Sequence, residues 1–595
     1  MNSAAVSRFF RERPFLIALC FALLVFIAKA VRDGMGLQEN FATKGNDDIM
    51  RLVTVRDWLA GQGWFDSTQY RILPPEGMPL HWSRYIDAGI AAIILPLTLF
   101  VPMELAEQIA VTIWPTLIFI LNLFVIAYGT RRLFGTWAAC SAMLCMVFWP
   151  LTGDLHSGAG NLDHHNVQML MMSIVALAIV WPERAVRAGL IGGVAAAFSI
   201  TVGLESLPFV VCAGALVLIN AILSGTQHGR QLLLSFCAAL GASSIVFWLG
   251  QTVPSELFNP ACDRLATPTL ALVGIAVVAS VLPFMFGRLL SKPLLQISAT
   301  VALTAIGVLI AWPLLSPCLG GPYGQLPQEV QDLISGKITE AKPILVYGVE
   351  RPGATLVFFL PVIVAVCFGT VLWLKGRHAP QSDESNTAAL GPLLVLILAG
   401  IAMTFVQMRT VIIAGSVVPI VGGYIISRFL KAYLRERQLT PALVGLAVAL
   451  SLISPSTIIG PLWPLLRTDN ADSSDAGNDC RSYASLNTLN EVPPALVLTH
   501  INFGPALIWA THHFGLAAPY HRSPAAFTNG IVPFTFAEEE MESYVRNTGA
   551  THLLLCRGYG YESAFVSDLA TGGSVDWLRR VVVSNDAQLL FEVLP

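Results

Sequence analysis

Charged residues are scarce in this sequence. Only 12% of its 595 residues are Asp, Glu, Lys or Arg, whereas 55% are hydrophobic and the mean hydropathy is +0.66. Soluble domains carry about 25% charged residues, so no single soluble core can bury this much apolar surface, and lipid must solvate much of it. The formal net charge of −3 is too small to favour nucleic-acid binding. The composition predicts a membrane protein that binds the lipid bilayer and no nucleic acid.

Paired cysteine motifs are also missing. The 10 Cys residues are scattered, and many lie within apolar runs. Because none has the CxxC spacing of zinc fingers or redox dithiols, neither chemistry is indicated. Cys262 and Cys318 fall in separate predicted external loops and could pair in an oxidising compartment, but spacing alone leaves that pairing open.

Long apolar runs, in contrast, are abundant. The first run, 14–31, follows Arg8, Arg11 and Arg13, which predicts a retained anchor with a cytoplasmic N-terminus. Since a spanning helix needs about 20 mostly apolar residues, the whole pattern predicts a polytopic α-helical membrane protein with about 13 transmembrane helices. The further spans are expected near residues 107–129, 134–150, 166–182, 187–203, 206–224, 231–250, 268–287, 294–315, 353–374, 388–407, 410–427 and 439–462.

Basic residues, which mark the cytoplasmic side, decide how the stretch 89–103 is interpreted. This stretch is apolar but short and interrupted by proline, so we interpret it as interfacial or re-entrant. If it does not span, every basic cluster falls on the cytoplasmic side, and if it does span, each later cluster moves outside. The clusters are Arg131/Arg132, Arg184/Arg187, Arg230, Arg288/Lys292, Lys375/Arg377 and Arg428/Lys431/Arg435/Arg437.

The predicted topology divides the chain into two domains. Residues 1–462 form the transmembrane domain, in which 32–106 is the first external loop and 316–352 the fifth. An odd number of spans leaves residues 463–595 outside the cytoplasm. There a polar linker at 469–479 precedes strand-like runs at 495–498, 552–556 and 589–593 and an acidic helical stretch at 537–545. We therefore expect a small C-terminal α/β domain in the periplasm or an equivalent compartment.

Acidic residues and histidines gather in these external loops. Asp47 lies in Gly-Asn-Asp-Asp-Ile-Met-Arg, Asp163 and His165 lie in Asn-Leu-Asp-His-His-Asn, and Glu340 lies in Lys-Ile-Thr-Glu-Ala-Lys. Carboxylate oxygens suit Mg²⁺ or Mn²⁺, and an added imidazole favours Mn²⁺. On extended backbone, residues i and i+2 project to the same side. This predicts that Asp163 and His165 share a metal while His164 points away.

A simpler interpretation competes with the metal site. A lone acidic residue in an external loop is usually solvated, and we favour that for Asp33, Asp57, Asp87 and Asp154. The Asp163–His165 segment is equally compatible with a cap on the helix that follows it.

The order of these motifs resembles the catalytic subunit of oligosaccharyltransferase, of archaeal or bacterial type, within the GT-C class of membrane glycosyltransferases. That family has the same number of spans, an external C-terminal domain, and acidic motifs in its first, second and fifth external loops, so the likeness extends over nearly the whole chain. The resemblance implies catalytic roles for Asp47 and Glu340. It also implies a metal site formed by Asp47, Asp163, His165 and Glu340. A donor-phosphate site is implied at Arg409.

The motif that reads the protein acceptor is altered. The family's Trp-Trp-Asp-Tyr-Gly has its best counterpart in His-Ile-Asn-Phe-Gly, where Asn502 replaces the Asp and both tryptophans are gone. The resemblance therefore does not extend to the glycosylation of Asn-x-Ser/Thr sites. Asn502, Tyr520, His521 and Arg522 are candidate residues for another acceptor, although a structural loop is an alternative for the last three. Glu205, near the outer end of a span, has no predicted role.

The resemblance implies a metal-dependent glycosyltransferase. It would move a sugar or oligosaccharide from a polyprenyl phosphate or pyrophosphate donor to an extracytoplasmic protein, lipid or surface polysaccharide. Two alternatives stay open: a transporter or flippase for lipid-linked glycans, which would place ionisable residues inside its spans, and a non-catalytic assembly factor. We expect an integral protein of the bacterial inner membrane with a cytoplasmic N-terminus.

Overall fold

The computed structural model describes residues 13–286, 290, 292–324, 326–378, 387–466, 477 and 479–595. Nearly all of the predicted linker 469–479 lies outside these residues, as do Arg8, Arg11 and Arg288.

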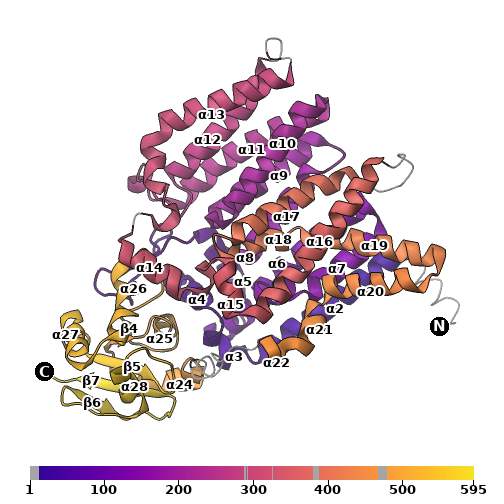
Figure 1. Cartoon of the computed structure of the whole chain (residues 1–595). Helices are drawn as coiled ribbons and strands as arrows, with labels where there is room; N and C mark the ends of the chain where they lie inside the picture. The colour runs from indigo at the N-terminus through magenta and orange to yellow at the C-terminus, as the bar shows by residue number, and fades with distance from the viewer. Residues whose placement is uncertain are drawn as a thin grey trace.

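Helices build the membrane part of the chain (Figure 1). They are joined by short loops and 3₁₀ turns, with one two-stranded ribbon formed by β1 (Thr68–Gln69) and β2 (Met78–Pro79). The helices are α2 (Pro14–Met35), α3 (Leu37–Asn40), α4 (Asn46–Leu59), α5 (Arg84–Leu97), α6 (Met103–Phe134), α7 (Thr136–Phe148), α8 (His165–Ile179), α9 (Ala185–Val202), α10 (Leu207–Ser224), α11 (Gln227–Gln251), α12 (Thr267–Met285), α13 (Pro293–Leu315), α14 (Gln328–Lys337), α15 (Ile344–Glu350), α16 (Pro352–His378), α17 (Leu390–Thr404), α18 (Val411–Gly415), α19 (Val418–Glu436), α20 (Leu439–Ile453), α21 (Pro455–Ile459) and α22 (Trp463–Leu466).

The predicted polytopic architecture is confirmed. Within the described residues, 9 helices are long and apolar enough to cross a membrane: α2, α6, α9, α10, α11, α12, α13, α16 and α17. Two bent pairs add up to two more spans, α18 with α19 at 50° and α20 with α21 and α22 at 106°. The shorter apolar helices α7 and α8 occupy two further predicted positions. Helix α5, in the stretch interpreted as interfacial, is not among these candidates.

Glycines allow some of the helices to lie very close together. On α9, a Cβ atom added at Gly193 would lie 2.4 Å from the Phe236 carbonyl oxygen of α11, and one added at Gly189 would lie 2.6 Å from the Leu232 carbonyl oxygen. Small residues at such spacing favour close packing between membrane helices, where lipid supplies little hydrophobic driving force. The α9–α11 contact therefore depends on the absence of side chains at these two positions.

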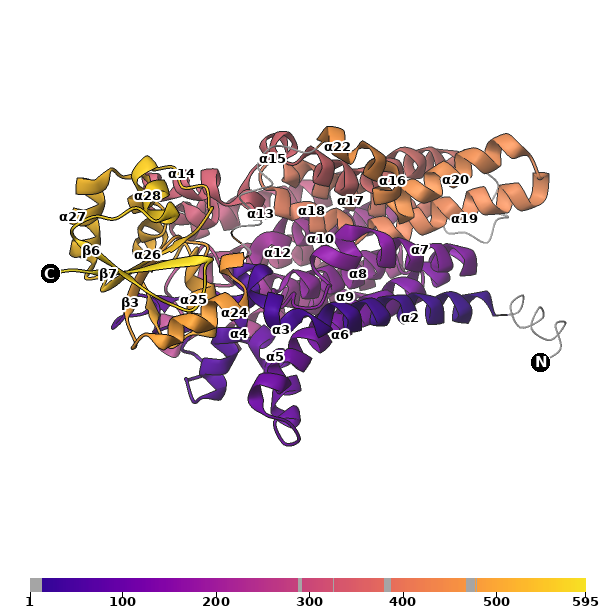
Figure 2. The same cartoon turned by 90° about the horizontal axis from the view of Figure 1, so that it is seen from below.

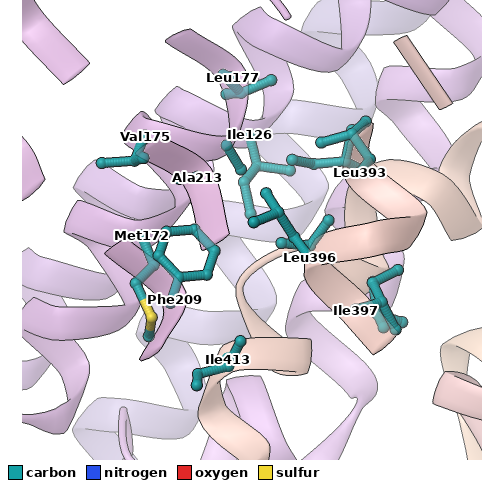
Figure 3. Close-up of a cluster of buried hydrophobic side chains, with 14 of the residues drawn as sticks. Ile126, Met172, Val175, Leu177, Phe209, Ala213, Leu393, Leu396, Ile397 and Ile413 are labelled. Carbon is teal, nitrogen blue, oxygen red and sulfur yellow. The ribbon is translucent and has the colours of Figure 1, made fainter. Parts of the chain in front are cut away.

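A buried apolar cluster joins the helices that carry the site. Figure 3 shows side chains from α6, α8, α10, α17 and α18 meeting in it, among them Met172 and Val175 of α8 and Ile413 of α18. The Ser173 hydroxyl also donates to the Ser416 carbonyl oxygen at 3.1 Å. This packing fixes α8 relative to α18.

The bundle has two different ends. Figure 2 shows the C-terminal domain at one end, while α2 begins at the other. The Arg131 guanidinium lies 4.6 Å from the Phe15 ring, near the start of α2, and Arg132 pairs with Glu183. The Arg131/Arg132 cluster, predicted to be cytoplasmic, thus lies at the end opposite the C-terminal domain.

The C-terminal segment folds into the predicted α/β domain. Its five-stranded sheet has the order β4-β3-β5-β7-β6, in which β3 pairs in parallel with β4 and β5, and β7 pairs antiparallel with β5 and β6. The strands predicted from the sequence correspond to β3, β5 and β7, and the acidic stretch corresponds to α27. The elements are α24 (Tyr483–Asn487), β3 (Leu496–Thr499), α25 (Gly504–Ala510), β4 (Phe514–Gly515), α26 (Pro524–Asn529), α27 (Glu538–Thr548), β5 (His552–Cys556), α28 (Ala564–Thr571), β6 (Leu578–Val581) and β7 (Gln588–Val593).

Two disulfides join segments that are predicted to be external. The pairing of Cys262 with Cys318, left open by the sequence, is present and joins the α11–α12 loop to the segment after α13. A second disulfide, which sequence reasoning missed, joins Cys480 to Cys556 on β5.

Candidate active site

One large cavity, of about 1250 Å³, lies between the bundle and the C-terminal domain. All the residues predicted to bind metal or donor phosphate line it, as do three of the candidate acceptor residues. These residues are Asp47, Asp163, His165, Glu340, Arg409, Asn502, Tyr520 and His521. Arg522 is not among its lining residues.

The first acidic motif forms the N-terminus of α4. Gly45 is the N-cap, and the Asp48 carboxylate accepts a hydrogen bond from its N–H at 3.1 Å. The other oxygen of Asp48 accepts the N–H groups of Leu162 and Asp163, at 2.7 and 2.9 Å. Asp48 therefore fastens the second motif to the first and places Asp163 beside Asp47.

Asp47 lies among other acidic groups. Burial, together with the nearby carboxylates of Asp163, Glu340 and Asp48, raises the pKa of Asp47 to about 8. Tyr520 shares this environment: burial, together with Asp47 and Asp163, raises the pKa of its hydroxyl well above the ordinary value, and this hydroxyl donates to the Asn46 carbonyl oxygen at 2.9 Å. Acidic groups thus gather at the start of α4.

Asp163 contacts both histidines of the second motif. Nδ1 of His164 lies 2.6 Å from one Asp163 oxygen, and Nδ1 of His165 contacts the other. The prediction that His164 points away is wrong, because its backbone is helical (φ −70°, ψ −12°) rather than extended. Burial alone would raise the pKa of Asp163, but the two histidines hold it well below its ordinary value.

In the described residues, only one of the two ring nitrogens of His165 has a hydrogen-bond partner. Within the described part of the chain, its Nε2 atom is buried and has no hydrogen-bond partner. The remainder of the ring is held by Asp163 and stacks between His156 and His164. A buried polar atom without a partner is costly, so this nitrogen is available to a ligand.

A buried arginine, Arg51, lies beside Asp163. The Arg51 side chain is fully buried, with its guanidinium 4.3 Å from the Trp82 ring. It binds Asp87 at 3.1 Å, and its other terminal nitrogen lies 3.9 Å from Asp163. Asp87, expected to be solvated, is buried because Arg51 and Arg84 both pair with it.

Arg409 lies at a junction of acidic and aromatic groups. It donates to the Tyr323 hydroxyl at 2.9 Å, and its other terminal nitrogen lies 3.7 Å from Glu205 and 3.8 Å from Glu340. A hydrogen bond at 2.9 Å from the Met408 N–H to the Lys342 carbonyl oxygen fastens the fifth loop to this segment. The fifth loop therefore brings Glu340 to Arg409.

Glu205 is a functional candidate that had no role predicted from the sequence. Its carboxylate lies 3.3 Å from both His164 Nε2 and Gln168 Nε2, and 3.7 Å from Arg409. It therefore links the second motif to the predicted phosphate-binding arginine. An ionisable residue at the end of a span was the only signal for it in the sequence.

The candidate acceptor residues separate into two groups. The Asn46 amide nitrogen donates to the Asn502 side-chain oxygen at 3.3 Å, so Asn502 and Tyr520 both lie next to the start of α4. His521 and Arg522 instead bind Asp263, in the loop between α11 and α12.

His81, Asp263 and His521 also bring potential ligand atoms within 4.8 Å of one another. Both oxygens of Asp263, however, accept hydrogen bonds from Arg522 at 2.7 Å. The guanidinium already supplies the positive charge there, so we assign no metal to this group.

The chain matches no protein-family model and no curated protein sequence. It does match solved structures. The archaeal oligosaccharyltransferase AglB from Archaeoglobus fulgidus, in complex with an inhibitory peptide and a dolichol-phosphate, superposes with a TM-score of 0.65 at 14% identity, over 92% of this chain and 70% of that one. This chain shares the oligosaccharyltransferase fold. The same archaeal protein in complex with Zn and sulfate gives a TM-score of 0.61 at 15% identity, over 91% and 68% of the two chains. The resemblance inferred from motif order is thus confirmed for the GT-C fold.

Proposed function

We propose that this protein is a metal-dependent glycosyltransferase of the oligosaccharyltransferase-like type. It transfers a sugar or oligosaccharide from a polyprenyl phosphate or pyrophosphate donor to an extracytoplasmic acceptor. The observation that supports this most strongly is the convergence of Asp47, Asp163, His165, Glu340 and Arg409, from separate segments, on one cavity.

The residues fit a divalent cation. The unpartnered, buried Nε2 atom of His165 offers one ligand, and the carboxylates of Asp47, Asp163 and Glu340 would supply oxygens. The raised pKa of Asp47 reflects its burial and the carboxylates around it, whose mutual repulsion a cation would relieve. This mixture of oxygen and imidazole ligands suits Mn²⁺ or Mg²⁺. When bound, such a cation neutralises the leaving phosphate as a Lewis acid.

Arg409 is the proposed donor-phosphate ligand. A guanidinium binds phosphate through charge-assisted, often bidentate hydrogen bonds. Glu205 and Glu340, at 3.7 and 3.8 Å, together with the hydroxyl of Tyr323 at 2.9 Å, hold the Arg409 side chain toward the cavity. Their contact leaves the guanidinium oriented before the donor arrives.

The cavity also has an apolar wall suited to a polyprenyl chain. Leu272 of α12, Val308 and Trp312 of α13, and Phe358 of α16 line it. Only Gln296 and Leu315 of α13 are buried, as expected for a helix that faces lipid. AglB was solved with a dolichol-phosphate, a lipid phosphate of the same chemical class as the carrier part of the proposed donor.

Asp47 and Glu340 are the proposed catalytic residues. The Asp47 carboxylate would accept a hydrogen bond or proton from the acceptor nucleophile, while Glu340, on the fifth loop, completes the metal ligands or holds the acceptor. Asn502 and Tyr520, next to the start of α4, are on the acceptor side. Because Asn502 replaces a carboxylate, we propose no glycosylation of Asn-x-Ser/Thr sites, and the acceptor class stays open.

We propose that the protein lies in the bacterial inner membrane, with its N-terminus in the cytoplasm and its C-terminal domain in the periplasm. Basic residues near the start of α2 support this. Two disulfides at the opposite end of the bundle, where an oxidising compartment would keep them intact, also support it.

Transfer is tested in cells that lack the gene. Glycolipids and glycoproteins are compared by mass spectrometry after complementation with the wild-type protein, Asp47→Ala, Asp163→Ala, or the control Glu104→Ala on the exposed first turn of α6. Wild type and Glu104→Ala should restore one missing linkage, whereas the two site variants should restore less than about 1% of it, since they remove groups that act at the reaction centre. Full restoration by both site variants would refute the proposal.

A further inference from the structure

Asp263 lies where the membrane bundle meets the C-terminal domain. Its carboxylate, almost wholly buried, accepts hydrogen bonds from Nε and Nη2 of Arg522, both at 2.7 Å. The same carboxylate lies 2.9 Å from Nε2 of His521. Burial alone would raise the pKa of Asp263, but these contacts lower it well below its ordinary value. Asp263 is therefore an ionised carboxylate that holds two neighbouring side chains of the C-terminal domain.

His521 transmits this contact into the cavity. Its ring packs edge to face against the Tyr323 ring, with centroids 5.0 Å apart. The Tyr323 hydroxyl in turn accepts a hydrogen bond from Arg409 at 2.9 Å. An unbroken series of contacts thus runs from Asp263 through His521 and Tyr323 to Arg409.

The Cys262–Cys318 disulfide joins the segments that carry Asp263 and Tyr323. Cys262, the residue before Asp263, is bonded to Cys318, shortly before Tyr323 in the fifth loop. The loop that holds His521 is therefore covalently joined to the segment that carries the partner of Arg409. Three segments far apart in the sequence thus converge on the cavity.

We propose that Asp263 is a positioning residue for donor binding: it holds His521 against Tyr323 and thereby fixes Arg409. This inference rests on the proposed function, in which Arg409 binds the donor phosphate. If Asp263 served only to fasten the α11–α12 loop to the C-terminal domain, its ion pair with Arg522 would be sufficient. His521 shares the same carboxylate oxygen with Arg522 and presents its ring to the cavity.

The test uses the full-length protein in detergent, titrated with a C55 polyprenyl phosphate and followed by tryptophan fluorescence, because Trp312 lines the cavity. Asp263→Ala should bind the lipid phosphate about tenfold more weakly than wild type, the size of one lost charge-assisted contact. The matched control is Glu256→Gln, which breaks an exposed ion pair with Arg264 in the same loop and should bind normally. Mn²⁺ affinity, measured by calorimetry, should be unchanged in both variants.

A double-mutant cycle separates positioning from a structural role. His521→Ala should weaken binding as much as Asp263→Ala, and the double variant should show no further loss, because both changes interrupt the same series of contacts. Asp263→Asn, which keeps the side-chain size, replaces the alanine variant if that protein does not fold. Additive losses, or wild-type affinity in the Asp263 variants, would overturn the inference while leaving the proposed function intact. A wild-type protein that binds neither Mn²⁺ nor the lipid phosphate would overturn both.

Discussion

Asp47 and Asp48 are adjacent in the sequence, yet the fold gives their carboxylates different tasks. Three backbone N–H groups donate to Asp48. Burial and Asp163 still raise its pKa to about 6, against about 8 for Asp47. Asp48 thus holds the two motifs together, whereas Asp47 is the proposed catalytic residue and metal ligand.

Substitution of Asp48 should therefore harm the protein through its structure. Asp48→Ala leaves buried N–H groups of Gly45, Leu162 and Asp163 without an acceptor, and should destabilise the protein by about 3 kcal/mol. Asp48→Asn keeps one acceptor oxygen and should cost less. Thermal unfolding in detergent measures both, with Asp47→Ala as the matched neighbour. A lower melting temperature for Asp47→Ala than for Asp48→Ala would contradict this division of roles.

Topology and motif order led to candidate residues that line one cavity, and sequence reasoning failed where local backbone mattered. His164 was expected to point away because the segment was treated as extended, whereas it is the helical N-cap of α8. Asp87 was expected to be solvated because its buried partners, Arg51 and Arg84, reach it only in the folded chain. Sequence patterns do not reveal such side-chain contacts, because the contacts depend on how the helices are placed relative to one another.

At the scale of elements, hydropathy predicted the spans well because a bilayer imposes one length on every helix. The breaks within the last spans were not predicted: α18 and α19 meet at 50°, and α20 meets α21 and α22 at 106°. Helix α4 was also missed, since its sequence is too polar for a span and its first turn carries the first acidic motif.

The α9–α11 contact gives a test at this scale. Gly193→Leu would place side-chain atoms against the backbone of Phe236, where even a Cβ atom would lie 2.4 Å from a carbonyl oxygen. We expect destabilisation of about 3 kcal/mol, because a packed backbone cannot yield as a flexible side chain can. Gly214→Ala on α10, where an added Cβ meets no atom within 4 Å, is the control and should unfold at the wild-type temperature. Equal melting temperatures for the two variants would contradict the packing account.

The site exists only in the whole molecule. Asp47 comes from α4, Asp163 and His165 from the start of α8, Glu340 from the loop before α15 and Arg409 from the segment before α18. The sequence predicted that these residues share one face of the membrane. It did not predict the Asp263–Arg522 ion pair or the Cys480–Cys556 disulfide, since contacts between a loop and a separate domain depend on how the two parts dock.

We propose above all that these separate segments hold one divalent cation. Calorimetric titration of the purified protein with Mn²⁺, after chelation and dialysis, measures this. We expect one Mn²⁺ per wild-type chain, with affinity lowered at least about tenfold by Asp163→Ala or His165→Ala, since each removes a direct ligand, and unchanged by Glu104→Ala, which lies outside the cavity. Stoichiometric, wild-type binding by both ligand variants would contradict it.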